Sequence, residues 1–253
     1  MALTRNSALH GMRDGVRWCA AGEQGEAHVW ICLMPIWGLP EIFEAMESAG
    51  VRRVVALSST SADSKRHARS EQDRLLSKAL EQGEQQFAEW ARRRCVEWVV
   101  LRTTLIHGDG RDRNVADIAR WLQRWRFFPL VGGGRGLRQP VHVADVAEAC
   151  LRLVRQASLP AGVFNLVGGE TLSYRDMVSR IASVQGVRCV LLPVPRGLIR
   201  LGMRLLACLP RYRHLSPDLA DRMNADLVFD GAPLQALLGW TAGRFVPQRV
   251  ESR

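Results

Sequence analysis

The sequence predicts an α/β protein built on a doubly wound parallel sheet, with a smaller carboxyl-terminal lobe. Short apolar runs rich in β-branched residues alternate with longer segments of helical periodicity, and no internal repeat or low-complexity linker divides the chain. With 253 residues, 47% of them hydrophobic, the chain can bury a sizeable core. We expect a sheet domain over residues 1–160, in which 1–27 are irregular, and a lobe over 161–253 that also receives residues 106–136.

Three apolar runs are the predicted strands of the amino-terminal half. They are Val29–Met34, Val51–Leu57 and Val96–Thr103. A helix from Pro40 to Gly50, closed by the glycine, and a long polar helix from Ser70 to Arg94 connect them. This alternation predicts that the three strands are parallel neighbours.

The second half continues the alternation. The predicted elements are a Gly-Asp-Gly turn at Gly108–Gly110, a helix from about Asn114 to Trp125, a loop at Val131–Gly136, a strand at Leu137–Val143, a helix with Asp145 as its N-cap, a strand at Gly162–Val167 and a helix from Ser173. Ser173 and Asp176 are spaced like the two partners of a capping box, which marks the start of that last helix.

The six cysteines are scattered and form no C-x-x-C pair. With no secretory leader recognised, this pattern predicts free thiols in a reducing compartment, and therefore a cytoplasmic protein without a zinc site. No apolar run approaches the roughly 20 residues that span a bilayer.

The net charge of +10 suggests an anionic partner. However, the chain has 33 arginines and two lysines, which indicates a composition bias rather than a binding stripe. Arg120–Phe128 is a basic and aromatic cluster of the kind that binds nucleic acid. However, Trp121 and Trp125 are spaced like one apolar helix face and are expected in the core, so that nucleic acid is the less favoured partner. The arginine-striped segment Pro195–Pro210 suits an anionic membrane surface, but packing on the protein is favoured.

Four segments together resemble the extended short-chain dehydrogenase/reductase superfamily and, within it, the NAD-dependent epimerase/dehydratase group. These are Gly50–Thr60 (GVRRVVALSST), Val100–Asn114 (VLRTTLIHGDGRDRN), Arg138–Ala147 (RQPVHVADVA) and Gly162–Asp176 (GVFNLVGGETLSYRD). The resemblance covers most of the chain from about His28 onward. It implies a Rossmann-like fold that holds NAD(P) at the carboxyl edge of its sheet and binds a small substrate, often a nucleotide sugar, with the carboxyl-terminal lobe.

The resemblance also implies roles for individual residues. Thr60 matches the family's catalytic serine or threonine, which hydrogen-bonds the reacting oxygen. Arg138 matches an arginine that holds a substrate phosphate; an arginine paired with a surface carboxylate is the alternative interpretation. The expected cofactor-binding residues are Arg5, Met34, Pro35, Ser58, Ser59, Arg102 and Thr103. His142 and Asp145 also match, but we interpret them as packing and capping residues.

The first departure from the family concerns its base. Members use Tyr-x-x-x-Lys, in which the lysine lowers the tyrosine pKa. The two tyrosines of this chain, Tyr174 and Tyr212, have no such partner, and the residues four before Lys65 and Lys78 are Ser61 and Arg74. The sequence therefore argues against proton-coupled hydride transfer of the usual kind.

The second departure lies at the front of the chain. The glycine-rich turn that brings a backbone close to the pyrophosphate is absent, and Gly132–Gly134 cannot replace it because a strand follows. Ala2–Asn6 is similar to the end of the family's second strand, where Arg5 would contact the 2′-phosphate of NADP. The nine residues between Val16–Cys19 and Val29 are too few for a helical crossover. The first strand, its turn and its helix are expected to be missing.

The sequence thus predicts an NAD(P)-dependent epimerase-, dehydratase- or reductase-like protein with a degenerate active site. NADP is favoured over NAD, binding of either is expected to be weak or absent in this chain, and the substrate is expected to be small and anionic. The alternative is a non-catalytic relative that keeps the fold to bind a nucleotide or a partner protein. The sequence also allows a homodimer.

Overall fold

The computed structural model describes residues 2–3, 11–13, 16–19, 23, 25–110, 112, 114–195 and 223–250. The chain divides into two compact units, each assembled from separate stretches. Unit 1 contains Met1–Ser59, Lys78–Arg102 and Cys150–Phe164, and unit 2 contains Thr60–Ser77, Thr103–Ala149 and Asn165–Arg253. The boundary expected near residue 160 stays a prediction.

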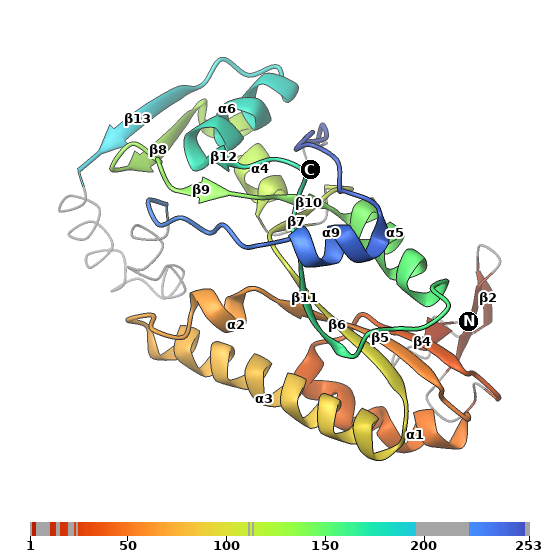
Figure 1. Cartoon of the computed structure of the whole chain (residues 1–253). Helices are drawn as coiled ribbons and strands as arrows, with labels where there is room; N and C mark the ends of the chain where they lie inside the picture. The colour runs from red at the N-terminus through yellow and green to blue at the C-terminus, as the bar shows by residue number, and fades with distance from the viewer. Residues whose placement is uncertain are drawn as a thin grey trace. The chain divides into compact units, whose positions relative to one another are not determined.

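Unit 1 is built on the predicted parallel sheet. Its strands are β4 (Val29–Cys32), β5 (Arg53–Ser59), β6 (Glu97–Thr103) and β11 (Gly162–Leu166), in the order β11-β6-β5-β4 (Figure 1). β4 and β5 are parallel, with Trp30 opposite Val54 and Cys32 opposite Ala56. The three predicted strands are therefore confirmed as neighbours in the expected order.

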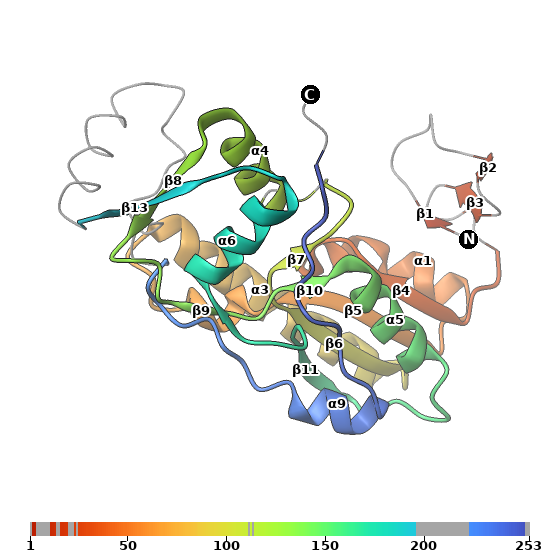
Figure 2. The ribbon, with the colours of Figure 1, turned by 90° about the horizontal axis from the view of Figure 1, so that it is seen from above.

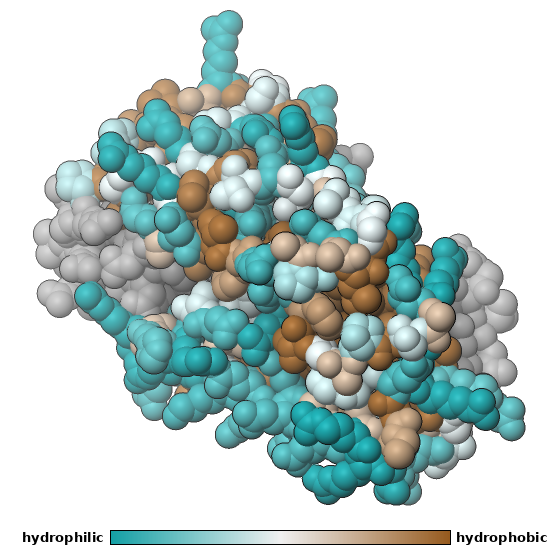
Figure 3. Space-filling view, in the orientation of Figure 1, coloured by the Kyte–Doolittle hydropathy of each residue, from teal (hydrophilic) through white to brown (hydrophobic). Residues whose placement is uncertain are grey.

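Helices connect these strands and bury apolar side chains against the sheet. The 3-10 helix η2 (Ile36–Ile42) and α1 (Phe43–Ser48) connect β4 to β5. The chain between β5 and β6 forms α2 (Ser61–Ser64) and α3 (Glu71–Arg93), of which residues 60–77 belong to unit 2. Phe87 of α3 is fully buried and lies edge-on to Trp98 of β6, with ring centroids 5.9 Å apart. Hydrophilic side chains, drawn in teal, lie along the lower edge of the space-filling view, where α3 runs (Figure 3).

Gly83 lies within α3 because the backbone of η2 leaves no room for a side chain there. A Cβ there would lie 2.8 Å from the backbone nitrogen of Trp37 and 2.9 Å from the carbonyl carbon of Ile36. The helix and η2 therefore approach more closely than any other residue type would allow.

The middle of the sheet is buried on both faces, whereas β4 at its edge is partly exposed to solvent. Val54, Val55 and Ala56 of β5 are buried in succession, as expected for a strand covered on both faces. In β4 only alternate residues are buried, and Val29 and Ile31 are 51% and 37% exposed. Among the described residues, β4 has no second partner strand in this sheet.

The described amino-terminal residues form a separate small sheet. β1 (Ala2–Leu3) is parallel to β3 (Val16–Cys19), and β2 (Gly11–Arg13) is antiparallel to β3. The strand at Val16–Cys19 belongs to a different sheet from β4.

Unit 2 packs two helices against short strands (Figure 2). The helices α4 (Val115–Trp125) and α6 (Tyr174–Val184) and the parallel pair of β8 (Phe127–Val131) and β13 (Val190–Val194) form one core, which includes Ile118, Leu122, Leu130, Met177 and Ile181. Further elements of the second half are α5 (Val143–Val154), α9 (Ala232–Leu238) and the two-stranded pairs of β7 (Ile106–His107) with β10 (Val141–His142) and of β9 (Leu137–Arg138) with β12 (Leu172–Ser173).

Unit 2 confirms the predicted cap at Ser173 and corrects three other expectations. The Ser173 hydroxyl accepts from the Asp176 N–H at 3.0 Å and donates to its carboxylate at 2.7 Å. Asp145 is not an N-cap, because α5 begins at Val143 and the Asp145 carboxylate instead accepts from the Gly243 N–H. The strand expected at Leu137–Val143 is two short strands with different partners.

The third correction concerns the tryptophans of α4. Trp121 and Trp125 are 41% and 50% exposed, whereas Ile118, Ala119 and Leu122 fill the core. Spacing alone identified an apolar stripe but not which stripe is buried.

Candidate functional site

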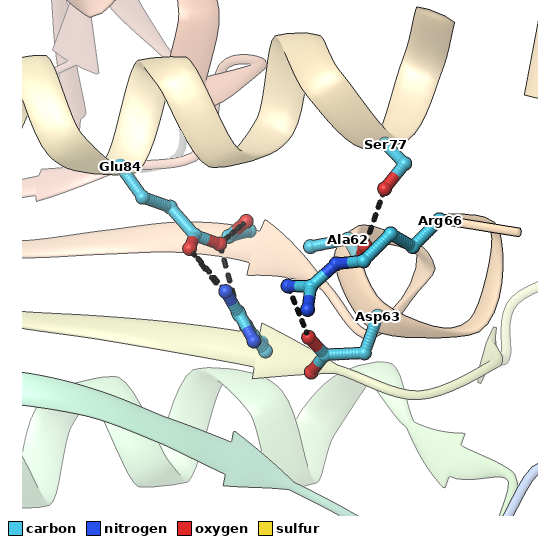
Figure 4. A network of polar contacts seen from close by, with 7 residues as sticks. Ala62, Asp63, Arg66, Ser77 and Glu84 are labelled. Atoms are coloured by element: carbon cyan, nitrogen blue, oxygen red, sulfur yellow. Dashed lines mark hydrogen bonds and ion pairs between the residues drawn. The ribbon is translucent and has the colours of Figure 1, made fainter. Parts of the chain in front are cut away.

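Two strand ends of the unit 1 sheet are joined by a buried network around Glu84. The Ser58 hydroxyl, near the end of β5, donates to Glu84 Oε1 at 2.5 Å. Arg102, near the end of β6, donates through Nε to Glu84 Oε1 and Oε2 at 3.0 and 3.2 Å and through Nη2 to Oε2 at 2.6 Å. Figure 4 shows the Glu84 side chain directed from α3 toward these strands. The carboxylate thus fixes the helix to both strands.

The burial of this network makes it a structural tie. The side chains of Glu84 and Arg102 are 5% and 17% exposed. A guanidinium that forms a fork with a buried carboxylate is held in one orientation. Ser58 and Arg102 are predicted to bind the cofactor, but both already use polar groups of their side chains to bind Glu84.

Glu84 was not identified from the sequence, although a signal was present. It lies four residues after Leu80 and three before Phe87, and both of these are buried. An acidic residue within the apolar stripe of a helix indicates a buried partner. The partners lie 26 and 18 positions away, so that only the fold identifies them.

Thr60, the predicted catalytic residue, lies directly after β5 and is 7% exposed. Its hydroxyl donates to the Thr103 carbonyl oxygen at 3.2 Å, and its N–H donates to the same oxygen at 3.1 Å. Thr103 is the last residue of β6 and is 5% exposed. The structure therefore brings together these two predicted residues through the backbone of one and the hydroxyl of the other.

The remaining predicted cofactor residues flank β4 and β5. Met34 and Pro35 follow β4, and the Pro35 carbonyl accepts from the Gly38 N–H at 2.9 Å at the start of η2. Ser59 is the last residue of β5 and is half-buried. Arg5 lies outside the described residues. Since carboxyl ends of parallel strands meet at one edge, Met34, Ser58 and Ser59 belong to the edge where α/β proteins bind nucleotides.

Arg138, the predicted substrate residue, is buried in unit 2 with 5% exposure. Its Nη1 donates to the carbonyl oxygens of Leu137 and Ala225, each at 2.7 Å, and its guanidinium lies 5.4 Å from the centre of the Tyr174 ring. The alternative interpretation required Arg138 to lie at the surface and pair with a carboxylate there. A surface position is wrong, because Arg138 is buried.

Tyr174 does not replace the missing base. Burial raises the pKa of its phenol to about 12, and the nearby charge of Arg138 only partly opposes this. At neutral pH the phenol is therefore protonated. The usual family base, in contrast, needs a lowered pKa.

His107 is an ionisable group that sequence reasoning missed. It is 1% exposed, lies 4.7 Å from the Phe245 ring and 5.1 Å from the His142 ring, and neither of its ring nitrogens has a hydrogen-bond partner within the described structure. Burial, and then the charge of His142, lower its pKa to about 4, against the opposing influence of Asp112 and Asp145. It is therefore neutral at pH 7.

The described residues contain no group of three or more His, Cys, Asp or Glu side chains placed to hold a metal ion. No helix among them has the length and apolar character needed to cross a bilayer.

Comparison with known proteins gives one family and one fold. A model described as the NAD dependent epimerase/dehydratase family matches residues 38–166. The UDP-glucose 4-epimerase of Vibrio cholerae is 24% identical over 170 residues, which cover 67% of this chain and 49% of that protein.

Solved structures agree with this fold. The UDP-N-acetylglucosamine 4-epimerase of Bacillus cereus superposes with a TM-score of 0.67 at 14% identity, covering 95% of this chain and 81% of that one. The UDP-glucose 4-epimerase of Thermus thermophilus in complex with NAD gives 0.56 at 20% identity, covering 80% and 63%. The chain spans about half the length of the curated relative it matches.

Proposed function

Because the chain belongs to the NAD-dependent epimerase/dehydratase family, whose model matches half of its length, we propose that it is an NAD(P)-dependent epimerase-like protein acting on a small anionic substrate, with a nucleotide sugar as the first candidate. The observation that supports this proposal is the edge formed by the ends of β4 and β5. These strands are parallel neighbours, and β5 ends in Ser58 and Ser59, followed by Thr60. Polar groups at this edge are where doubly wound sheets bind nucleotides.

In this proposal Met34, Pro35, Ser59 and Thr103 contact the cofactor, together with Ser58, Arg102 and Arg5. The cofactor supplies hydride transfer when bound. The protein's own contribution is to orient it and to place a hydroxyl donor, Thr60, beside the reacting oxygen. NADP is proposed over NAD on the strength of Arg5.

Arg138 is proposed to hold the negative charge of the substrate. A guanidinium is a planar donor that suits phosphate oxygens, and burial strengthens such a contact. MoeE5, whose fold is similar, was solved in complex with UDP-glucose and NAD, which supports a nucleotide sugar as the first compound to test.

A second function is favoured by a specific observation, the absence of a usable base among the residues that the structure describes. Tyr174 is protonated at neutral pH because of its burial, and the hydroxyls of Ser58 and Thr60 already donate within the protein. A non-catalytic relative that binds a nucleotide or a partner protein is the alternative.

Calorimetric titration with NADP(H) and NAD(H) tests the cofactor part. We expect weak binding or none, because without a glycine-rich turn the remaining contacts do not offset the cost of immobilising the ligand. A dissociation constant near 1 μM, equivalent to about −8 kcal/mol, would show that this edge binds the cofactor without such a turn.

Thr60→Val separates the two functions. It preserves shape and removes the hydroxyl, so that turnover of UDP-glucose or another nucleotide sugar should fall by roughly a hundredfold if Thr60 stabilises the transition state. Thr104→Val is the matched control, because Thr104 is also buried and its hydroxyl also donates to a carbonyl, that of Gln139 at 2.5 Å. Equal activity in the two variants would remove Thr60 from the mechanism, and a wild type inactive with every nucleotide sugar would favour the binding function.

Arg138→Lys tests the substrate contact. A lysine keeps the charge but loses the fork, so that KM should rise more than kcat falls. Thermal unfolding of the same variant shows whether the lost bonds to Leu137 and Ala225 also lower stability. A KM equal to that of the wild type would contradict the proposed role.

A further inference from the structure

One surface of unit 2 combines exposed aromatic and aliphatic side chains with arginines. It lies where α4 meets the paired strands β8 and β13 (Figure 2). We call it the tryptophan–arginine patch. Its apolar members are Trp121, Trp125, Val190 and Leu192, and its cationic members are Arg124, Arg126 and Arg188. Neither the fold nor the proposed function makes use of these side chains.

The apolar members are connected through Phe127. The Trp121 indole donates to the Phe127 carbonyl at 2.9 Å, and the two rings lie edge to face with centroids 6.1 Å apart. Trp125 is a further 6.1 Å from Trp121. In the parallel register Val190 stands opposite Phe127, so that its side chain adjoins this cluster on the same face.

Exposure shows that these side chains face solvent. Trp121, Trp125, Val190 and Leu192 are 41%, 50%, 60% and 42% exposed. The opposite face of β8 is buried, because Phe128 and Leu130 belong to the core with α4 and α6. The two strands therefore separate a closed core from an uncovered apolar face.

The charged members of the patch are all cationic. Arg124, Arg126 and Arg188 are exposed, and none of them is ion-paired within the described part of the chain. The Arg124 guanidinium lies 5.2 Å from the centre of the Trp125 ring. In the segments 115–131 and 184–194 the one acidic residue is Asp117, which is paired with Arg120 at 2.8 Å.

We propose that the tryptophan–arginine patch is a docking surface for an anionic lipid bilayer. Indole rings locate at the interface of a membrane, where an apolar body and an N–H are both accommodated. Val190 and Leu192 add aliphatic surface that enters the acyl boundary, and the unpaired arginines match the phosphates of acidic headgroups.

The composition favours lipid over single-stranded nucleic acid. A stacking platform for bases presents flat aromatic faces, whereas the Trp121 and Trp125 rings are tilted by 42° and adjoin aliphatic side chains. Aliphatic side chains gain little from nucleic acid bases but are stabilised by transfer into the bilayer interface.

Sedimentation of the full chain with vesicles tests the proposal. We expect binding to phosphatidylcholine vesicles that contain about a third phosphatidylglycerol, weakening at high salt, and little binding to phosphatidylcholine alone. Each arginine should contribute about a fivefold factor to the partition coefficient, so that R124Q/R126Q/R188Q should bind about a hundredfold more weakly. Trp125→Ala should cost at least tenfold.

Two matched controls make the result decisive. Trp37→Ala removes a tryptophan of similar exposure, 46%, in unit 1, and R52Q/R92Q/R155Q removes three exposed arginines of unit 1, so that the net charge equals that of the patch variant. Both controls should bind like the wild type. The proposal is overturned if the wild type does not sediment with anionic vesicles, or if either control loses as much binding as its patch counterpart. Oligo(dT) binding that the patch variants abolish, without any vesicle binding, would assign the patch to nucleic acid instead.

Discussion

Replacing Glu84 by glutamine should destabilise the protein strongly, because it removes the charge that Arg102 depends on. Arg102 is 17% exposed and donates through Nε and Nη2 to the Glu84 carboxylate at distances from 2.6 to 3.2 Å. Breaking a buried pair by removing one partner costs about 3–5 kcal/mol. The partial exposure of Arg102 places this variant at the lower end, at about 3 kcal/mol.

Urea and thermal unfolding measure this loss. For a chain of this size, about 3 kcal/mol corresponds to a fall in Tm of about 6–12 °C. Glu89→Gln is the matched control on the same helix, since its partner Arg93 and Glu89 itself are 75% and 58% exposed. A surface pair of this kind contributes about 0.5 kcal/mol.

The double variant E84M/R102M tests the reasoning further. Removing both charges and filling the space with apolar side chains should recover most of the lost stability, because no unpaired charge remains. The interpretation fails if Glu84→Gln is no more destabilising than Glu89→Gln, or if the double variant is less stable than Glu84→Gln.

Three other outcomes follow from single positions. Folding holds His107 neutral with its pKa at about 4 instead of 6.5, so that the unfolded state binds the proton first and stability should fall by about 3 kcal/mol as pH drops from about 6.5 to 4; unfolding of His107→Leu followed across that range should show a flatter profile. Ser173→Ala removes the bond accepted from the Asp176 N–H and should lower stability by about 1 kcal/mol in urea unfolding, whereas an unchanged midpoint would mean the cap contributes nothing. Gly168→Ala would place a Cβ 1.8 Å from the Pro140 carbonyl oxygen and should therefore lower the Tm. A Tm within about 2 °C of the wild-type value would contradict that close approach.

The strands of unit 1 were predictable because their composition and burial coincide. β5 and β6 are runs of valine and leucine covered on both faces, and such runs are hydrophobic whatever the register. The position of the polar residues after β5 follows from the same pattern, so that the sequence located Ser58 and Thr60 at a strand end.

The elements that were missed depend on distant pairing. Phe127–Val131 and Val190–Val194 are each five residues long and pair across about sixty positions, with no turn or helix pattern that joins them. The interpretation of Trp121 and Trp125 as core residues failed for a related reason. A helix such as α4 has more than one apolar stripe, and the partner that covers one of them is set by the fold.

The hydrogen-bond partners of the polar residues could be identified only from the structure. These partners indicate which of the two hydroxyls, that of Ser58 or that of Thr60, can turn more easily toward a ligand. Ser58 donates to the carboxylate of Glu84 at 2.5 Å, a charged acceptor, whereas Thr60 donates to a neutral carbonyl at 3.2 Å. A hydrogen bond to a charged group contributes about 1.5–3 kcal/mol and a neutral one about 1 kcal/mol. Turning Thr60 toward a bound molecule therefore costs about a fivefold factor, and turning Ser58 costs more than tenfold. Ser58→Ala should accordingly lower stability more than Thr60→Val does, and Thr60→Val should weaken ligand contacts more than Ser58→Ala does. If Ser58→Ala instead weakened NADP(H) binding at unchanged stability, the carboxylate of Glu84 would not be the group that holds this hydroxyl.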